Sequence, residues 1–249
     1  MGKQREFFIL FSIVMVFILS SCQLSPIFNV VQGSGTLVTE NRPISNFNAI
    51  KLDGAGRLII NQGDSESLEI RADDNLISNL TAEVQGDTLY LGYREKPWRK
   101  TILPSTSVVY TLSIVTLNKL TLNGAADVEI HALETDTFAL TINGAGTVSI
   151  QDLATGQLNI ALAGTGSVSA SGFSEEQSII IDGAGSYQAG GLQTKITSIN
   201  INGLGNGTVW ATDSLDVNIV GGGTVNYYGS PNLTQEISGL GEVKNIGEK

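Results

Sequence analysis

The amino-acid sequence predicts an all-β chain that forms a single-domain parallel β-helix with about 18–20 residues in each coil. Three observations support this prediction. A short glycine-containing unit recurs at nearly constant spacing, alternating apolar and small polar residues fill the intervals, and no stretch after residue 21 shows helical periodicity over a useful length. A repeat of about this length that holds two or more short strands corresponds to one coil of a β-solenoid.

The recurring unit has the order apolar, any, Gly, any, Gly or Ala. Its last seven copies follow one another at nearly equal intervals and begin at Leu122, Ile142, Leu162, Ile181, Ile201, Ile219 and Ile237. Less regular copies begin at Val31 and Leu52. One coil cannot bury its apolar side chains alone, so we expect successive coils to stack about 4.8 Å apart with parallel strands.

Glycine is expected wherever the chain bends with positive φ or wherever the next coil approaches too closely for a Cβ atom. Most of the 29 glycines lie between Leu117 and Lys249, in the regular repeats. A phosphate-binding loop is a poor alternative, because the units lack the full spacing, the following helix and the Lys of such loops. The predicted turn glycines are Gly54, Gly124, Gly144, Gly164, Gly183, Gly203, Gly222 and Gly239.

The residue before the first glycine of each unit recurs as well. These residues are Asp53, Asn123, Asn143, Ala163, Asp182, Asn202, Val220 and Ser238. Asn and Asp at turns cap backbone groups and tolerate left-handed φ, and we expect this role here; at stacked positions we expect them also to form hydrogen bonds along the column. A calcium-binding solenoid would instead need Asp two residues after the second glycine, where this sequence has Val148, Val168 and Tyr187. The sequence therefore predicts a structural column and no metal site.

The regular repeats are predicted over residues 117–249, and residues 33–116 are predicted to be a less regular version of the same design. Within the latter, Asp73-Asp74-Asn75 indicates a turn or the start of a short helix. Residues 92–107 contain two prolines and four basic residues and are expected to form a surface loop. Further strands are expected at 47–52, 57–60, 68–70 and 88–91.

The first residues are typical of an export sequence. Lys3 and Arg5 precede a run from Phe7 to Leu19 that is apolar except for one serine and is too short to span a bilayer. Leu19-Ser20-Ser21-Cys22 resembles a bacterial lipobox, in which cleavage exposes the cysteine for lipid attachment. We therefore predict a lipoprotein signal peptide over 1–21, and a lipidated Cys22 with a tether over 22–32. The alternative is an ordinary signal peptide followed by a chance cysteine.

Composition excludes several classes of function. The net charge is −10, or −11 once residues 1–21 are removed, and such a surface is unsuited to binding nucleic acid. The single cysteine excludes an internal disulfide and a four-cysteine zinc site. No cofactor or metal is predicted. The expected location is the cell envelope, at the outer membrane or the cell surface.

Candidate ligand-contacting residues are few. Glu129 and His131 are two residues apart on an expected strand, so their side chains would share a face; His131 is the only histidine. The pair could act as an acid and a base or form half of a metal site. The favoured alternative is that both side chains simply belong to the polar outer face of the strand. Trp98 lies in a basic, aromatic cluster that could touch anionic headgroups or a partner. Three further aromatic residues could stack on sugars or pack between coils: Trp210, Tyr227 and Tyr228.

No catalytic residues are predicted. Acidic residues, among them Glu134, Asp136 and Glu175, recur at scattered positions of the repeat and do not converge on one coil, as a glycosidase pair would. No arginine follows Arg99, so the regular repeats are poorly suited to neutralising the acidic sugars that polysaccharide lyases bind.

Several ordered segments, together with the repeated units, resemble the bacterial "putative auto-transporter adhesin, head GIN domain" family over about residues 33–246. They are Gly33-Ser34-Gly35, residues 42–50 (RPISNFNAI), Ala72-Asp73-Asp74-Asn75, residues 225–231 (VNYYGSP) and Ile237-Ser238-Gly239-Leu240-Gly241. The resemblance implies a secreted or lipid-anchored parallel β-helix with an adhesin label and no catalytic residues to carry over.

The expected function is that of a non-enzymatic, lipid-anchored envelope protein with an adhesion or binding role. Its expected partners are the membrane, through the lipid on Cys22, and a surface glycan or protein. Two alternatives stay open: a carbohydrate-active enzyme, either lyase or hydrolase, on the same fold, and a structural envelope element without a specific ligand.

Overall fold

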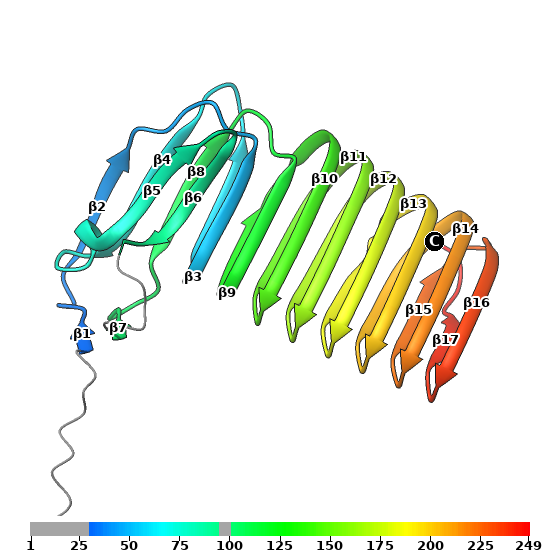
Figure 1. The fold of residues 1–249 in the computed structure, drawn as a ribbon. Coiled ribbons are helices and arrows are strands. Elements are labelled where there is room, and N and C mark those ends of the chain that lie inside the picture. Colours follow the sequence, from blue (N-terminus) through cyan, green and yellow to red (C-terminus); the bar gives the residue numbers. More distant parts are fainter. Residues whose placement is uncertain (1–29, 95–100) are drawn as a thin grey trace, which may run out of the picture. The chain divides into compact units, whose positions relative to one another are not determined.

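The computed structural model describes residues 30–94 and 101–249 (Figure 1). The predicted signal peptide, Cys22 and Trp98 lie outside these residues. Residues 32–94 and 104–249 form one compact unit. Strand β1 (Val30–Gln32) pairs with β7 (Thr101–Leu103) in a second sheet of two strands. No helix among the described residues has the length and apolar character required to cross a bilayer.

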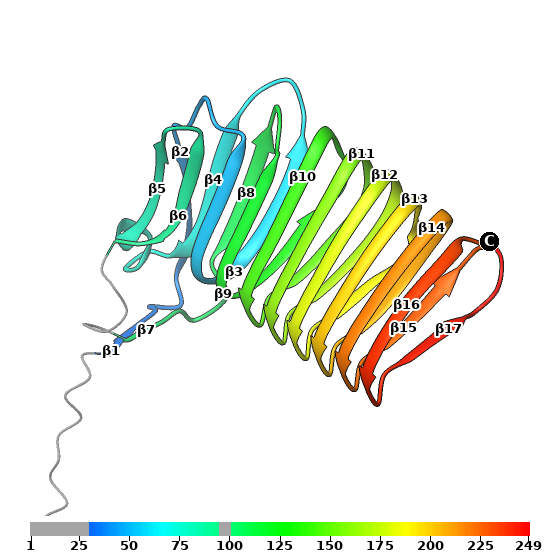
Figure 2. The ribbon, with the colours of Figure 1, turned by 45° about the vertical axis from the view of Figure 1, so that its right-hand side comes forward.

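The larger unit is a parallel β-solenoid, which confirms the predicted fold (Figures 1 and 2). Strands pair in register with the strand one coil away, so that Ile142 lies beside Leu162 and Gly144 beside Gly164. The regular part begins with β3 (Ala49–Gln62), β9 (Lys119–Ile130) and β10 (Leu133–Gly144), and continues with β11 (Thr147–Gly164), β12 (Ser167–Gly183), β13 (Ser186–Gly203) and β14 (Asn206–Gly221). The last coil holds β15 (Thr224–Tyr228), β16 (Asn232–Gly239) and β17 (Glu242–Asn245).

Each long strand bends to wrap one coil. In β11, residues 158–164 lead into a turn glycine and form part of what we call the first face. Residues 147–150 follow the preceding turn and form part of the second face, and residues 151–157 connect the two along a third side. Alternate side chains point inward, and Val148, Leu158 and Ile160 are each at most 2% exposed. Period-2 alternation thus builds one continuous apolar interior from many short strands.

One polar network is buried inside this interior. The Gln177 side chain donates hydrogen bonds to the Thr194 and Thr197 hydroxyls at 3.1 and 3.0 Å, and it accepts one from the Tyr187 hydroxyl at 2.8 Å. All four residues are at most 3% exposed. Burial raises the pKa of the Tyr187 hydroxyl well above its usual range. Because every member has a partner, the network does not carry the cost of an unsatisfied buried group.

Glycines with positive φ mark the turn between the first and second faces. Seven of the eight predicted turn glycines have φ between 123° and 141°. At Gly183 a Cβ atom would lie 2.6 Å from the Gly164 carbonyl oxygen, so both the conformation and the stacking of coils require glycine. The prediction of Gly222 is wrong: Gly221 has the positive φ and pairs with Gly203.

The Asn and Asp residues before these glycines form a ladder along the solenoid, as predicted. The Asn123 amide donates to Asp53 at 2.5 Å, Asn143 donates to Asn123 at 2.8 Å, and Asn202 donates to Asp182 at 2.7 Å. Ala163 interrupts the ladder between Asn143 and Asp182. These side chains therefore link successive coils and do not cap the turn of their own coil.

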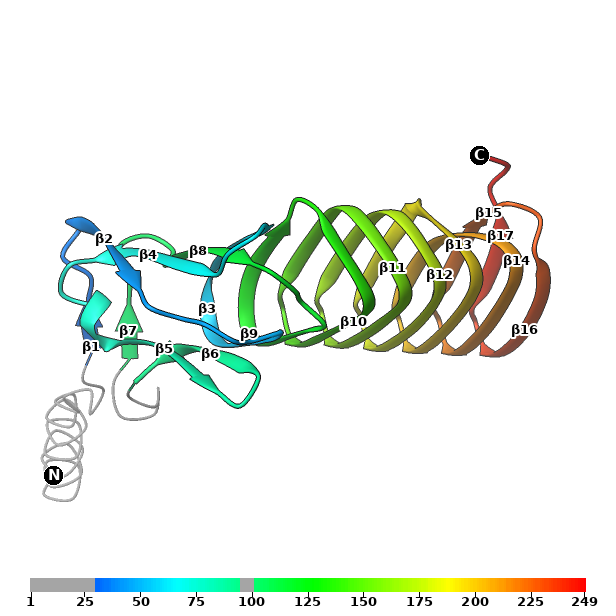
Figure 3. The same ribbon diagram turned by 90° about the horizontal axis from the view of Figure 1, so that it is seen from above.

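The N-terminal region departs from the expected design. Although β3 pairs in parallel with β6 and β8, the other strands are antiparallel: β2 with β4, β4 with β8, and β5 with β6. Figure 3 shows β4 and β8 extending one face of the solenoid and β5 and β6 extending the other. The strands span β2 (Leu37–Arg42), β4 (Ser67–Asp73), β5 (Leu80–Gln85), β6 (Thr88–Tyr93) and β8 (Val109–Ile114). Only β5 and β6 are consecutive strands joined by a short turn, as in a hairpin, whereas β2, β4 and β8 come from separate parts of the chain.

Asp73 joins three segments of this region. Its carboxylate accepts hydrogen bonds from the Gly35 amide at 2.8 Å, the Ser105 amide at 2.9 Å and the Ser105 hydroxyl at 2.5 Å. The side-chain bond from Ser105 is the main reason that the pKa of Asp73 is lowered, against the opposing effect of burial. The turn predicted at residues 73–75 is confirmed and leads into a short 3₁₀ helix, η1 (Ile77–Asn79).

Candidate functional site

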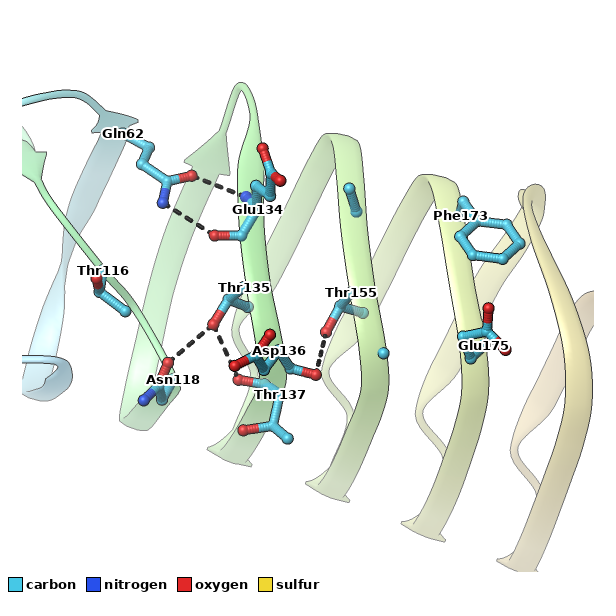
Figure 4. Close-up of a pocket in the computed structure, with 12 residues that line it drawn as sticks. Gln62, Thr116, Asn118, Glu134, Thr135, Asp136, Thr137, Thr155, Phe173 and Glu175 are labelled. Carbon is cyan, nitrogen blue, oxygen red and sulfur yellow. Dashed lines mark hydrogen bonds between the residues drawn. The ribbon is translucent and has the colours of Figure 1, made fainter.

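An open groove of about 770 Å³ runs across the third side of the solenoid (Figure 4). It crosses adjacent coils: Glu134 and Asp136 come from β10, Thr155 from β11, and Phe173 and Glu175 from β12. A smaller hollow of about 560 Å³ shares part of its lining and adds Asp64 and Asp152. The groove is thus long in the direction of coil stacking and open to solvent.

Hydrogen bonds hold the groove at its N-terminal end. The Gln62 side chain donates to the Glu134 carbonyl oxygen at 3.0 Å and accepts from the Glu134 amide at 2.7 Å, as a strand neighbour would. The Thr135 hydroxyl donates to the Asn118 side chain at 2.8 Å. These contacts place the Glu134 and Asp136 segment of β10 between the loop before β9 and the next coil.

Hydroxyl side chains hold the bends on the third side. Thr155 donates to the Gln157 carbonyl oxygen two residues later at 3.2 Å, and Ser174 donates to the Glu176 carbonyl oxygen at 2.7 Å. Thr155 is 6% exposed and Ser174 is fully buried. Ser and Thr hydroxyls satisfy backbone groups in this way at bends that leave the regular ladder. The floor of the groove is therefore fixed, while its charged side chains reach solvent.

The groove carries negative charge. Glu134, Asp136 and Glu175 are all exposed, and among residues 30–94 and 101–249 only Glu175 of these three is paired with a cation, with Lys195 Nζ 2.7 Å from its carboxylate. The hydrogen bond from Lys195 to Glu175 is the main cause that raises the pKa of the Lys195 amine. Phe173 adds an aromatic ring that is 38% exposed. The lining suits a ligand with hydroxyl or other donor groups and one apolar face, and it repels anions.

These groove carboxylates are the acidic residues that the sequence leaves scattered. They converge across neighbouring coils and not within one coil. The repeat spacing predicts this convergence. Asp136 and Glu175 are two repeats apart, as Leu122 and Leu162 are, to within one residue, so they occupy equivalent positions in different coils. Among residues 30–94 and 101–249, no group of three or more His, Cys, Asp or Glu side chains is arranged to hold a metal ion.

Glu129 and His131 do not act together in this structure. Glu129 forms an ion pair with Arg57 of β3 at 2.7 Å, and His131 Nδ1 lies 2.7 Å from the Asn61 side-chain oxygen. His131 follows the end of β9 at Ile130. Each side chain thus bonds across the β3–β9 pair to its own partner, which corresponds to the polar outer surface of a sheet.

The predicted aromatic residues separate into two environments. Trp210 and Tyr228 are register neighbours on β14 and β15, while Tyr227 packs against the apolar core. Lys249 Nζ lies 4.8 Å from the centre of the Tyr228 ring and 5.7 Å from that of Trp210. The tail of the chain therefore lies against this aromatic pair.

Comparisons with known proteins agree with the fold. The family model described as "Putative auto-transporter adhesin, head GIN domain" matches residues 46–231. No curated protein matches the chain.

Similar folds are found in several solved structures of bacterial proteins. A putative adhesin from Bacteroides fragilis is 28% identical, with a TM-score of 0.81 and coverage of 87% of this chain and 100% of that one. A putative lipid binding protein from Parabacteroides distasonis is 24% identical, with a TM-score of 0.74 and coverage of 88% and 100%. A putative adhesin from Parabacteroides merdae is 24% identical, with a TM-score of 0.68 and coverage of 88% and 99%. The last two similarities concern the fold alone.

Proposed function

This chain belongs to the "Putative auto-transporter adhesin, head GIN domain" family, and from that premise we propose that it is a lipid-anchored envelope protein that binds an uncharged surface glycan without chemically altering it. The groove on the third side is the proposed binding surface. Cys22 is the proposed attachment point for the lipid.

The single observation that carries the binding proposal is the groove's extent across β10, β11 and β12. An extended polymer can contact equivalent positions in each coil, since the coils repeat at the spacing of neighbouring strands. Sugar hydroxyls can donate to the carboxylates of Glu134 and Asp136, and a pyranose ring can stack on Phe173. The negative charge disfavours acidic glycans, so an uncharged chain fits best.

Exposure of the carboxylates supports binding over hydrolysis. A general acid in a glycosidase needs a pKa raised by an apolar environment, beside a second carboxylate that stays ionised. Glu134, Asp136 and Glu175 are all exposed, and Lys195 pairs with the third. Such carboxylates are suited to accepting hydrogen bonds from a ligand.

The binding proposal is tested with the purified protein on an array of neutral, acidic and basic glycans. We expect retention of neutral glycans and at least a tenfold loss of affinity in Phe173→Ala and in the double variant Glu134→Gln, Asp136→Asn. The matched controls are Ile180→Ala and Asp182→Asn. Both residues are exposed, as the groove residues are, but they lie on the first face, outside the groove lining. Retention of acidic glycans only, or equal losses in the controls, contradicts the proposal, and release of shortened glycan in the same samples establishes the enzymatic alternative.

The anchoring proposal is tested by fractionation of cells that express the full chain or Cys22→Ser. We expect the full chain in the membrane fraction, labelled by a clickable fatty acid, and the variant in the soluble exported fraction without label. Membrane recovery of the unlabelled variant contradicts a lipid on Cys22.

A further inference from the structure

The last coil of the solenoid leaves its apolar interior open. Leu233 and Ile237 of β16 occupy the same register positions as Leu215 and Ile219 of β14. The two β14 residues are fully buried, whereas the two β16 residues are each 38% exposed. Leu240, in the turn between β16 and β17, is 92% exposed. Side chains in core positions are therefore partly in contact with water at this end.

The backbone at this end is open as well. Within the part of the chain that the structure describes, β16 pairs only with β14 and β17 pairs only with β15. The outer edges of β16 and β17 therefore present unpaired amide and carbonyl groups, which are ready to accept another strand. Figure 2 shows both strands at the C-terminal limit of the solenoid.

At the N-terminal end, by contrast, further strands cover the apolar interior of the first coil. Strand β3 is covered by β6 and β8, and Leu89 and Leu112 on these strands are fully buried. The antiparallel strands β4 and β5 then cover β8 and β6. The outermost strands at this end, β2 and β5, pair on one side only among the described residues, but they run antiparallel to their neighbours and do not repeat the coil pattern. Stacking of the open coil on this end in the pattern of the solenoid, and with it growth into a head-to-tail filament, is therefore disfavoured.

We propose that two copies of this chain associate through their C-terminal coils, with each β16 forming an antiparallel pair with β17 of the second copy. Strands β16 and β17 lie on opposite faces and run in opposite directions around one turn. A twofold rotation about an axis parallel to the strands exchanges the two faces and keeps the strand directions. The rotation thus brings β16 against the outer edge of β17 in both halves of the dimer.

The side chains match in this arrangement. The proposed register is symmetric about Leu240, in the turn between β16 and β17, and places Ile237 opposite Val243 of the second copy, both at core positions. The next pair outward is Glu236 with Lys244 of the second copy, both exposed on the outer surface. The following pair is Gln235 with Asn245 of the second copy. The Asn245 side chain already donates to the Gly229 carbonyl oxygen and accepts from the Gly247 amide of its own copy, so the apolar pair and the ionic pair carry the match.

Charge complementarity at this edge selects a second copy as the occupant. The twofold axis forms the Glu236–Lys244 pair twice, and an unrelated strand would have to supply the same charges in the reverse order. Pairing also buries the exposed core-position residues Leu233 and Ile237 and satisfies both open edges at once.

The first test is sedimentation equilibrium of the mature full chain over a range of concentrations. We expect a dimer whose dissociation constant rises at least tenfold in Glu236→Lys and in Lys244→Glu, because each change creates like-charge pairs. The double variant Glu236→Lys, Lys244→Glu restores opposite charges and should recover the dimer. Glu242→Lys, on the same coil but opposite Ser238 of the second copy, is the control and should have a smaller effect.

Thermal unfolding of each variant shows that the solenoid is intact. A protein that stays monomeric at its highest soluble concentration, or a dimer that neither single charge reversal weakens, overturns the proposal. Another assembly state, such as a trimer or a filament, overturns it too.

A second test does not depend on affinity changes. In a Cys22→Ser background, the double variant Glu236→Cys, Lys244→Cys should form a covalent dimer with two intermolecular disulfides on mild oxidation. A disulfide within one copy is excluded, because the two positions point outward on opposite faces of the coil. Failure to form the covalent dimer, while the variant folds, overturns the proposed pairing.

Discussion

The regular coils and the N-terminal region both consist of β-strands, but different contacts stabilise them. In the coils, the neighbour of each residue follows from the repeat, so that Gly144 lies over Gly124 and Ile160 beside Leu140. In the N-terminal region, antiparallel strands meet without a repeat, and one carboxylate, Asp73, links Gly35 to Ser105. The coils thus distribute their stability over equivalent contacts, while the N-terminal region depends on a few individual ones.

The largest effect is expected for Gly144→Val in the regular coils. Gly144 has φ of 141°, and a Cβ atom there would overlap the Gly124 carbonyl oxygen. Strain and steric overlap should together lower the free energy of unfolding by about 3 kcal/mol or more, measured by chemical denaturation.

Gly63→Val is the matched control in the N-terminal region. Its nearest neighbouring atom to an added Cβ is the Ser113 hydroxyl oxygen at 3.5 Å, and its φ is not positive. We expect a change of less than about 1 kcal/mol there. Equal losses at both positions would show that the glycine column has no special role in coil stacking.

The second effect concerns Asp73→Asn in the N-terminal region. The pKa of Asp73 is lowered in the folded state, chiefly by the hydrogen bond from Ser105, so the ionised form stabilises the fold. This stability is present above the unfolded pKa of about 3.9 and is lost as the pH falls through the lower folded value.

Chemical denaturation of both proteins between neutral and acidic pH measures this effect. We expect Asp73→Asn to be less stable at neutral pH, with the difference from the natural chain shrinking as the pH falls. The same change at Asp74, whose carboxylate lies outside this cluster of Gly35 and Ser105 bonds, serves as the control. A difference at Asp73 that is constant with pH would contradict the linkage.

The third effect concerns Tyr187→Phe inside the coils. Removing the hydroxyl leaves the buried Gln177 side-chain oxygen without its 2.8 Å donor. We expect a loss of about 1–3 kcal/mol in the free energy of unfolding. Tyr228→Phe, on the outer surface, is the control. Equal stability of the two variants would show that the Tyr187 hydroxyl does not stabilise the network, or that water replaces it as the donor.

The smallest effect is expected for Asn143→Ala in the exposed ladder. The change removes one hydrogen bond to Asn123, and we expect a loss of about 0.5–1 kcal/mol. A double-mutant cycle of Asn123→Ala and Asn143→Ala isolates the pair energy. The ladder already lacks one member at Ala163, so we expect each bond to act locally. A pair energy well above that of one hydrogen bond would show that the bonds of the ladder reinforce one another.

The same contrast explains which parts of the molecule the sequence predicts. Where the repeat is present, spacing alone predicts the coil, the turn glycines and the Asn and Asp ladder, because each coil reproduces the environment of the previous one. Gly222 is misassigned because three consecutive glycines, Gly221 to Gly223, leave the position of the unit undecided. The preceding Val220, which belongs to the Asn and Asp column, places the unit one residue earlier.

The groove and the antiparallel strands could not be derived in that way. Glu134, Asp136 and Phe173 become neighbours only when the repeat is applied to residues outside the glycine units. In residues 33–116 no repeat relates β4 to β5, so alternation indicates that strands exist but not which strand pairs with which, or in which direction.

The backbone hydrogen bonds between coils run along the solenoid axis, and this has a mechanical consequence. A pull on the C-terminal coil along that axis loads only the bonds to the adjacent coil, because each coil contacts just its neighbours. Coils should therefore detach one after another, and each detachment releases one repeat, or about 60–70 Å of extended chain. Under tension the molecule would lengthen in nearly equal steps at nearly constant force, and single-molecule stretching would display a regular series of such steps.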